Sequence, residues 1–148
     1  MTTNDRRMGT SSSFHGICGR GGGCAYLARY RQPAAVLGID ISPRAIAFCR
    51  RIHLVPGLSF RPGDAEALPC PAEAFDVVLN VESSHCYGSM PTFLNEVFRV
   101  LVPGGYFLWA DLGSAVPRTW MKAPSCLCRD RRKSRVLASS GRSQPKVL

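Results

Sequence analysis

The sequence predicts an α/β fold in which helices cover both faces of a doubly wound, mostly parallel sheet. Apolar runs of strand length alternate with amphipathic stretches of helix length from about residue 35 to residue 112. The run at 75–81 is apolar at almost every position, which is typical of a strand covered on both faces. Strands that alternate with helices pair in parallel through right-handed crossovers, and this pattern gives a doubly wound sheet.

The first elements follow from local residue chemistry. Residues 35–40 (AVLGID) form an apolar run of strand length. Ser42 and Pro43 then supply an N-cap and a first-turn proline for a helix over about 44–52. Residues 58–61 predict a short strand, which leads into a polar loop, GDAEALP.

The second half of the pattern contains two strands and one helix. Residues 75–81 (FDVVLNV) predict a buried strand. Pro91 opens a helix whose apolar positions 93, 97, 100 and 101 share one face, and the segment 103–105 (PGG) stops it. Residues 106–112 (YFLWADL) predict the next strand. After Leu112 no period of a strand or helix is sustained, so we expect residues 113–148 to be disordered or loosely attached.

Length and composition favour one globular domain. The chain has 148 residues and 45% hydrophobic content, enough for a single core. No stretch reaches the roughly 18 apolar residues that cross a bilayer, and no apolar segment precedes a cleavage site at the N-terminus. We therefore expect a cytoplasmic protein without a transmembrane segment.

The cysteine count and the charge distribution narrow the function classes. Seven cysteines are an odd number, and none forms a CxxC pair, so we expect small reduced residues and no metal site.

The net charge of +9 is distributed unevenly along the chain. Residues 1–112 hold ten Lys or Arg against nine Asp or Glu, whereas residues 113–148 hold nine against one. The basic character therefore belongs to the tail.

Four segments are expected to meet at one edge of the sheet, because ligands bind beyond the carboxyl ends of the strands. A glycine cluster lets backbone N–H groups approach a ligand ahead of a helix. Asp40, at the end of its strand, can accept both hydroxyl protons of a ribose. Asp64 with Ala65 can contact an adenine edge, and residues 80–84 close the pocket. The cluster comprises Gly19, Gly21, Gly22 and Gly23.

The order of these motifs resembles a known family. From about Cys18 to Leu112 the chain resembles class I S-adenosylmethionine-dependent methyltransferases of the type 11 group, which have a Rossmann-like fold. The similarity lies in CGRGGGCAYLARY, GIDIS, GDAEALPCPAEAFDVVLNVESSHCY and FLNEVFRVLVPGGYFLWADL. VLNVESSHCY followed by EVFRVLVPGGYF is most similar to mycobacterial phthiotriolone/phenolphthiotriolone dimycocerosates methyltransferases.

The resemblance implies methyl transfer from S-adenosylmethionine to an oxygen of a lipid or polyketide-derived acceptor in lipid biosynthesis, with no metal. Such chemistry depends mainly on proximity and orientation. His85 is the candidate base and Glu82 its orienting partner, although both can instead simply pack at the strand end. The implied cofactor contacts are Gly19, Gly21, Asp40, Ile41, Asp64, Ala65 and Asn80.

The two ends of the chain depart from the family pattern. The stretch 13–17 (SFHGI) is a weak version of the first strand, with His15 where the family has an acid and Ile17 where it has a glycine. The sixth and seventh strands are expected to be missing. We therefore divide the chain into a degenerate segment 1–17, a partial cofactor-binding domain 18–112 and a basic tail 113–148. A truncated or frame-disrupted chain is the corresponding hypothesis.

Three alternatives remain at this point. The chain can be a non-catalytic remnant of a methyltransferase. It can bind anionic surfaces weakly through the run 129–135 (RDRRKSR), although no motif for specific nucleic-acid binding is present. A dinucleotide-dependent oxidoreductase is disfavoured, because the GxGxxG pattern counted from Gly19 requires glycine at position 24, where Cys24 stands. The sequence does not specify the acceptor.

Overall fold

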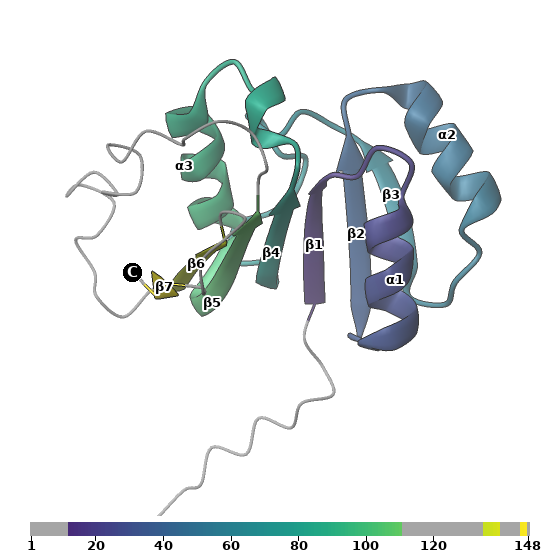
Figure 1. Ribbon diagram of the computed structural model, residues 1–148, viewed down its shortest axis with the longest axis horizontal. Helices are drawn as coiled ribbons and strands as arrows, with labels where there is room; N and C mark the ends of the chain where they lie inside the picture. Colours follow the sequence, from purple (N-terminus) through teal and green to yellow (C-terminus); the bar gives the residue numbers. More distant parts are fainter. Residues whose placement is uncertain (1–11, 111–134, 140–145, 148) are drawn as a thin grey trace, which may run out of the picture.

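The computed structural model describes residues 12–110, 135–139 and 146–147, and these residues form a seven-stranded sheet (Figure 1). The strand order is β3-β2-β1-β4-β5-β6-β7, and every pair is parallel except β6 with β7. This order confirms the predicted doubly wound, mostly parallel sheet. The strands are β1 (Ser12–Ile17), β2 (Ala35–Asp40), β3 (Leu58–Pro62), β4 (Phe75–Val81), β5 (Leu101–Ala110), β6 (Arg135–Ser139) and β7 (Lys146–Val147).

The helices divide between the two faces of the sheet. α1 (Gly22–Tyr30) and α2 (Pro43–Ile52) pack on one face, and their buried side chains share a cluster with β2 and β3. α3 (Met90–Val100) packs on the other face against a second cluster. The predicted caps are present in α2, where the Ser42 hydroxyl accepts a hydrogen bond from the Ala45 N–H at 3.3 Å.

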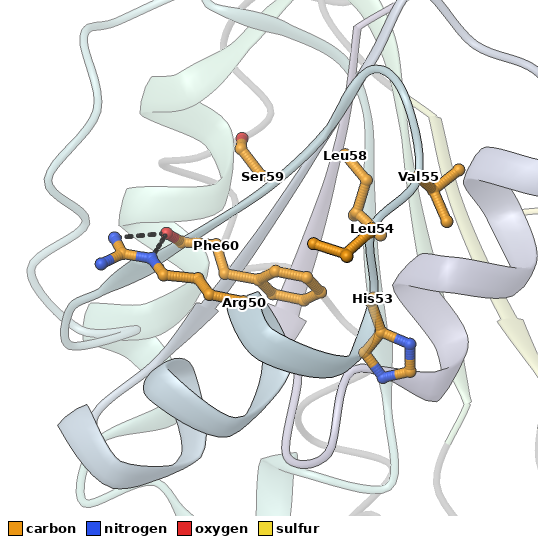
Figure 2. A pocket seen from close by; sticks show the side chains of 7 residues that line it. All are labelled: Arg50, His53, Leu54, Val55, Leu58, Ser59 and Phe60. Atoms are coloured by element: carbon orange, nitrogen blue, oxygen red, sulfur yellow. Dashed lines mark hydrogen bonds between the residues drawn. The ribbon is translucent and has the colours of Figure 1, made fainter.

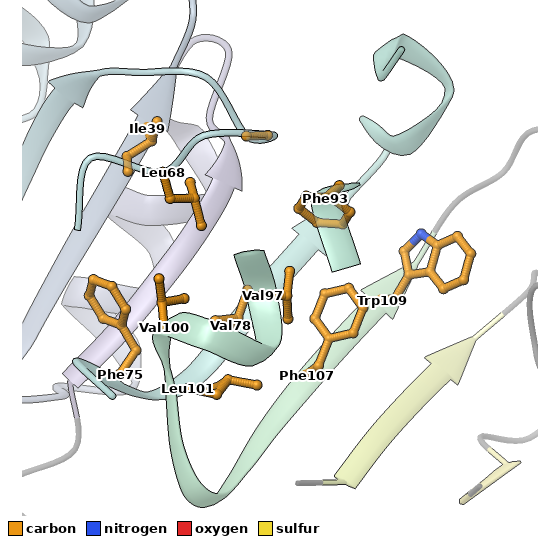
Figure 3. Packing of buried hydrophobic residues seen from close by; sticks show 11 residues of the cluster. Ile39, Leu68, Phe75, Val78, Phe93, Val97, Val100, Leu101, Phe107 and Trp109 are labelled. Carbon is orange, nitrogen blue, oxygen red and sulfur yellow. The ribbon is translucent and has the colours of Figure 1, made fainter. Parts of the chain in front are cut away.

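The larger cluster lies between α3 and the sheet (Figure 3). Phe93, Val97 and Val100 project from α3, and each is fully buried. They meet Val78 of β4 and Phe107 of β5, which confirms the apolar face predicted for this helix. The smaller cluster beneath α1 and α2 is built from Cys18, Cys24, Val36, Ile46, Cys49 and Phe60.

β1 occupies the centre of the sheet, between β2 and β4. Its backbone pairs with β2 from Ser12 to Ile17, with a shift in register between His15 and Ile17. It also pairs with β4 over three positions. The weak apolar content of this stretch therefore does not remove the strand from the fold, because ladder hydrogen bonds are made by backbone groups.

The boundary between α3 and β5 differs from the prediction. The helix ends at Val100 and β5 begins directly at Leu101, before the PGG segment. Leu101 pairs with Phe75, and the next pair joins Tyr106 to Val77, so the intervening residues leave the ladder. A proline has no N–H to donate to a ladder, and this explains why the segment that contains Pro103 interrupts pairing. PGG therefore bends a strand and does not cap the helix.

The tail also differs from the expectation at seven residues. β6 and β7 come from the segment that was expected to lack regular structure and to leave the sixth and seventh strands missing. Residues 136–138 (VLA) form a short apolar run, and β5 offers a free edge of backbone groups to it. Such a run is too short to show periodicity in sequence. The other predictions for the tail fall on residues outside the described ranges.

None of the helices in the described part of the chain combines the length and the apolar character that crossing a bilayer requires.

Candidate functional site

The carboxyl ends of β1 to β4 meet at one edge of the sheet, as expected for the predicted site (Figure 1). Asp40 ends β2 and pairs with Pro62 at the end of β3. The Gly63 N–H donates to the Asp40 carbonyl oxygen at 3.0 Å, so Asp64 follows directly beside Asp40 along this edge. The structure therefore places these two acids on the same edge.

Asp40 connects the glycine loop to β2. Its Oδ2 accepts a hydrogen bond from the Gly19 N–H at 2.9 Å, and its Oδ1 accepts one from the Ser42 N–H at 2.8 Å. The side chain is only 6% exposed. Each carboxylate oxygen carries two lone pairs, so one remains on each oxygen for a further donor. Asp40 thus holds the glycine loop and can still accept hydrogen bonds from two hydroxyl groups.

Two glycines of the loop have different reasons for lacking a side chain. A Cβ on Gly21, at φ 75°, would lie 2.8 Å from His53 Cδ2 and 3.0 Å from the Cys49 sulfur. Gly21 is therefore required by close packing. Gly19 has φ 50°, and a Cβ there would meet nothing within 4 Å. The side of Gly19 where a Cβ would stand is open, which is the arrangement expected where a ligand approaches, whereas its N–H and carbonyl oxygen are bonded to Asp40 and Cys49.

Two side chains that the sequence did not single out hold the glycine loop from α2. The Cys49 thiol donates to the Gly19 carbonyl oxygen at 3.3 Å, and His53 Nε2 lies 2.7 Å from the Arg20 carbonyl oxygen. A carbonyl only accepts, so Nε2 carries the hydrogen of that bond. Burial, followed by the neighbouring Cys18 thiol, raises the pKa of Cys49 to about 11, so it remains a neutral donor at physiological pH.

Ile41 and Ala65, both predicted cofactor contacts, differ in exposure. Ile41 follows Asp40 and is 66% exposed, so its apolar side chain is free to pack against a planar ring. Ala65 is buried in the cluster under α3. Asp64 is exposed, and its Oδ1 accepts a hydrogen bond from the Glu66 N–H at 2.8 Å. The predicted adenine contact of Asp64 and Ala65 stays a prediction.

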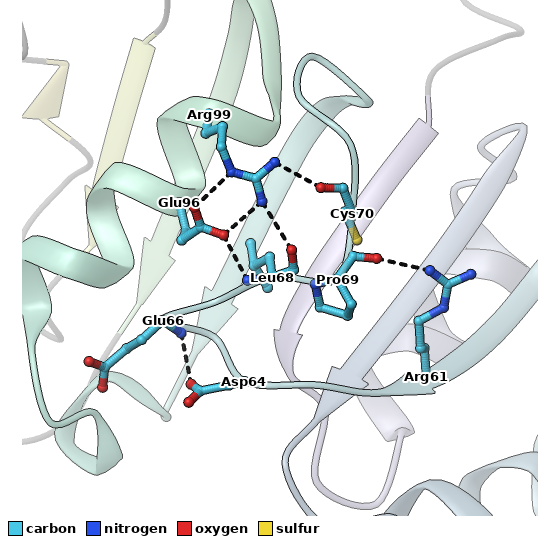
Figure 4. A network of polar contacts seen from close by, with 8 residues as sticks. All are labelled: Arg61, Asp64, Glu66, Leu68, Pro69, Cys70, Glu96 and Arg99. Atoms are coloured by element: carbon cyan, nitrogen blue, oxygen red, sulfur yellow. Dashed lines mark hydrogen bonds and ion pairs between the residues drawn. The ribbon is translucent and has the colours of Figure 1, made fainter.

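A charged clamp holds the β3–β4 loop to α3 (Figure 4). Glu96 and Arg99 form an ion pair at 2.7 Å on adjacent turns of the helix. Arg99 donates to the carbonyl oxygens of Cys70 at 2.8 Å and Leu68 at 3.0 Å. Glu96 accepts from the Leu68 N–H at 2.7 Å. The pair thus satisfies three backbone groups of the loop that carries Asp64.

The same pair is electrostatically matched. The hydrogen bond from Arg99, reinforced by that from the Leu68 N–H, holds the pKa of Glu96 below its ordinary value. The Glu96 carboxylate in turn raises the pKa of Arg99. An acid and a base three residues apart on a helix are a recognisable sequence signal for an ion pair. Their backbone partners, about 30 positions earlier, give no such signal.

A buried polar group stands at the carboxyl end of β4. Asn80 is fully buried, and its Oδ1 accepts hydrogen bonds from the hydroxyls of Ser83 and Tyr87, each at 2.5 Å. Its Nδ2 has no hydrogen-bond partner. Because buried donors are normally paired, an unpaired Nδ2 suits an acceptor atom supplied by a ligand. The sequence predicted Asn80 within the segment 80–84, which includes Ser83, but not that the hydroxyls of Ser83 and Tyr87 bond to its Oδ1.

The two predicted catalytic residues follow Asn80 on the same edge. Glu82 directly follows β4, is exposed and has φ 53°. His85 is also exposed and lies in a single 3-10 turn, Ser84–Cys86. Their position agrees with access to a substrate at this edge. The roles of base and orienting partner stay predictions.

The described cysteines are free thiols, and three of them (Cys18, Cys24 and Cys49) are buried together in the smaller cluster. Hydrogen bonding to Cys24 and burial raise the pKa of the Cys18 thiol. Within the described ranges, no group of three or more His, Cys, Asp or Glu side chains is arranged to hold a metal ion. Cys18, Cys24 and Cys49 contribute to the packing of the smaller cluster.

A cavity of about 410 Å³ lies between the end of α2 and β3 (Figure 2). None of the predicted site residues lines it. Arg50 at its rim donates to the Phe60 carbonyl oxygen through two nitrogens, at 3.0 and 2.7 Å. Its other lining residues are His53, Leu54, Val55, Leu58 and Ser59.

Comparison with solved structures identifies proteins that share this fold. An S-adenosylmethionine-dependent methyltransferase from Mesorhizobium loti matches with a TM-score of 0.61 and 26% identity, over 68% of this chain and 46% of that chain. The [4+2]-cyclase SpnF matches with a TM-score of 0.59 and 29% identity, over 66% of this chain and 37% of that chain. One architecture therefore occurs in proteins named for different reactions.

Comparison with curated proteins gives closer relatives. The phthiotriol/phenolphthiotriol dimycocerosates methyltransferase of Mycobacterium tuberculosis H37Rv is 56% identical over 95 residues. The fatty-acid O-methyltransferase of Mycolicibacterium smegmatis is 56% identical over 94 residues. The matches cover 64% of this chain but only 35% and 34% of those proteins, so the chain spans about a third of their length.

The family match covers the segment that builds the site. The methyltransferase-domain model matches residues 17–109, which include the glycine loop, Asp40, the clamp and Asn80. This stretch is more than half of the chain. The chain therefore belongs to the methyltransferase-domain family.

Proposed function

We propose that this chain binds S-adenosylmethionine at the carboxyl edge of β1 to β4 and transfers its methyl group to an oxygen of a lipid acceptor. The observation that carries the proposal is the contact between Asp40 and the glycine loop, because it unites the two predicted cofactor-binding motifs. The named activities of the relatives, on phthiotriol dimycocerosates and on a fatty acid, support a long-chain acceptor.

The residues present fit such a cofactor. Gly19 leaves open space beside its backbone, and Asp40 keeps a free lone pair on each oxygen. Ile41 offers an exposed apolar side chain next to Asp40. The unpaired Nδ2 of Asn80 needs an acceptor atom at the same edge. The cofactor, when bound, supplies a methyl group that is already activated by its sulfonium.

The protein then contributes mainly position and proton transfer. The sheet edge would hold the cofactor and the lipid acceptor side by side in a reactive orientation. The reaction then no longer depends on a chance encounter of two molecules in solution. An acceptor hydroxyl must lose its proton during the transfer, and the exposed imidazole of His85 is the group proposed to take it. A carboxylate acceptor needs no base. Removal of His85 is therefore expected to affect a hydroxyl acceptor more than a fatty acid.

Calorimetric titration of the full chain with S-adenosylhomocysteine tests the binding step. Saturable binding is expected, and Asp40→Asn should weaken it by about tenfold or more, since one charged hydrogen bond contributes about 1.5–3 kcal/mol. Transfer of a labelled methyl group to a fatty acid or to a phthiotriol lipid tests the reaction. Absence of binding at millimolar ligand by a folded chain would contradict the proposal, and binding without transfer would leave a binding domain.

A further inference from the structure

The charged residues of the described chain are divided between its two halves. Residues 19–62 contain seven arginines and one acid, Asp40. That acid is buried and hydrogen-bonded to backbone N–H groups, and among the described residues it forms no ion pair with these arginines. Residues 63–100 contain six acids and one base, Arg99. The near-neutral sum over residues 1–112 conceals this division.

The fold concentrates the arginines on one side of the sheet. α1 and α2 cover the same face, and their side chains share one buried cluster. Six exposed arginines belong to these helices and the loops at their ends, and none is paired with a carboxylate of the described residues. We call this group the basic layer; it comprises Arg20, Arg29, Arg31, Arg44, Arg50 and Arg51.

Two members of the basic layer converge on one aromatic ring. The guanidinium carbon of Arg20 lies 4.8 Å from the centre of the Phe48 ring, and that of Arg51 lies 6.0 Å from it. The glycine loop carries the first and α2 the second. Two cations beside one ring repel each other, and a shared anion relieves that repulsion. The arrangement therefore favours an anionic partner.

The basic layer also carries exposed apolar side chains. Tyr26 and Tyr30 of α1 are 55% and 69% exposed, and their rings lie 4.8 Å apart. Ile52 and Leu54, at the end of α2, are 51% and 83% exposed. Tyrosines, aliphatic side chains and arginines together are typical of surfaces that rest in the interfacial region of a bilayer. A partner with phosphates alone would not cover the aliphatic groups.

We propose that the α1–α2 side of the molecule docks on an anionic lipid bilayer. The arginines of the basic layer contact lipid phosphates, and Leu54, Ile52 and the two tyrosines enter the headgroup region. The acidic half, which includes the clamp, then faces away from the membrane. The proposal needs neither the cofactor nor methyl transfer, so it can fail or hold separately from the proposed function.

Sedimentation of the full chain with phosphatidylcholine vesicles, with and without phosphatidylglycerol, tests the docking. Binding is expected only with the anionic lipid, and it should weaken as salt is raised. The triple variant Arg29→Gln, Arg44→Gln, Arg51→Gln should bind about 100-fold more weakly, because each arginine near an anionic surface contributes about 1 kcal/mol. An unchanged melting temperature shows that the variant is folded.

A matched control removes the same charge from the tail. Arg131→Gln, Arg132→Gln, Lys133→Gln should weaken vesicle binding much less than the helical triple variant. The opposite ranking would overturn the proposal and assign the binding to the tail. Leu54→Ser should reduce binding to anionic vesicles by about tenfold and leave binding to single-stranded RNA unchanged. Tighter binding to RNA than to vesicles, with no effect of Leu54→Ser on either, would identify a nucleic-acid surface instead.

Discussion

Two loops reach the same edge of the sheet but are held there by different forces. The glycine loop is held by close packing at Gly21, by hydrogen bonds from the side chains of Cys49 and His53, and by the Asp40 carboxylate. The β3–β4 loop is held by the ion pair of Glu96 and Arg99, which bonds its backbone.

The difference predicts different sensitivities. Close packing responds to side-chain volume and hardly to pH. An ion pair that bonds backbone groups responds to the loss of either charge, because the remaining partner is left unsatisfied. In the glycine loop, the loss of stability should therefore depend on the size of the introduced side chain. In the clamp, it should depend on whether a charge is removed. The predictions below test this distinction.

Gly21→Ala should have the largest effect. The added Cβ would contact His53, Cys49 and Phe60 at 3.0 Å or less, at a positive φ. We expect a loss of about 2–5 kcal/mol in unfolding free energy from overpacking and the left-handed backbone together. Urea denaturation measures it. Gly22→Ala is the control: nothing lies within 4 Å of its Cβ and it begins α1, so stability should be unchanged or slightly raised. Equal losses would contradict close packing.

Glu96→Gln should destabilise the chain by about 2 kcal/mol, in the range for hydrogen bonds that involve charged groups. The substitution keeps the size of the side chain and removes the charge that Arg99 faces. Hydrogen exchange should accelerate at the Leu68 amide, which donates to this carboxylate. Glu73→Gln, at an exposed position, should leave that amide unchanged. If both variants behave alike, charge does not hold the loop.

The clamp should also make stability depend on pH. The folded protein lowers the pKa of Glu96 below its ordinary value of 4.5. The carboxylate therefore contributes stability that is fully present above pH 4.5 and is lost as the pH falls through the lower, folded value. The difference in unfolding free energy between wild type and Glu96→Gln should shrink over that window. A difference that stays constant down to pH 3 would argue against ionisation of Glu96 as the cause.

Cys49 should resist alkylation in the native chain. It is fully buried and its pKa is raised to about 11, so about one thiol in a thousand is ionised at pH 8. Cys86 is exposed. With iodoacetamide, mass spectrometry should detect modification of Cys86 long before Cys49, and urea should abolish the difference. Rapid native modification of Cys49 would show that the glycine loop opens.

Substitution of the helix caps should have the smallest effects on stability. Because α2 and α3 lie on opposite faces of the sheet, the two caps allow a direct comparison of these faces. Ser42 caps α2 and Ser89 caps α3, each through a hydroxyl that accepts from an N–H at 3.3 Å. Each change to alanine should cost about 1 kcal/mol in thermal or urea denaturation. Because both caps are local, equal losses are expected. A much larger loss for Ser42 would show that the cap also supports Asp40, whose Oδ1 accepts from the Ser42 N–H.

The sequence alone determined the parallel sheet and the positions of Asp40, Asp64 and Asn80 near strand ends. These features follow from local periodicity, from caps and from the topology of alternating strands and helices. The edge that collects the proposed cofactor-binding residues follows from topology as well. Local sequence patterns were thus sufficient to predict those features of the fold that depend on residues close to one another in sequence.

Only the tertiary structure decided how those segments are held. The contacts of Cys49 and His53 with the glycine loop, and of Arg99 with Leu68 and Cys70, join residues that lie about 30 positions apart in sequence. Such pairs leave no local pattern, because their distance depends on how helices and strands pack. The short strand β6 and the boundary at Leu101 also depended on a neighbouring strand, since edge pairing can select a strand that its own sequence does not specify.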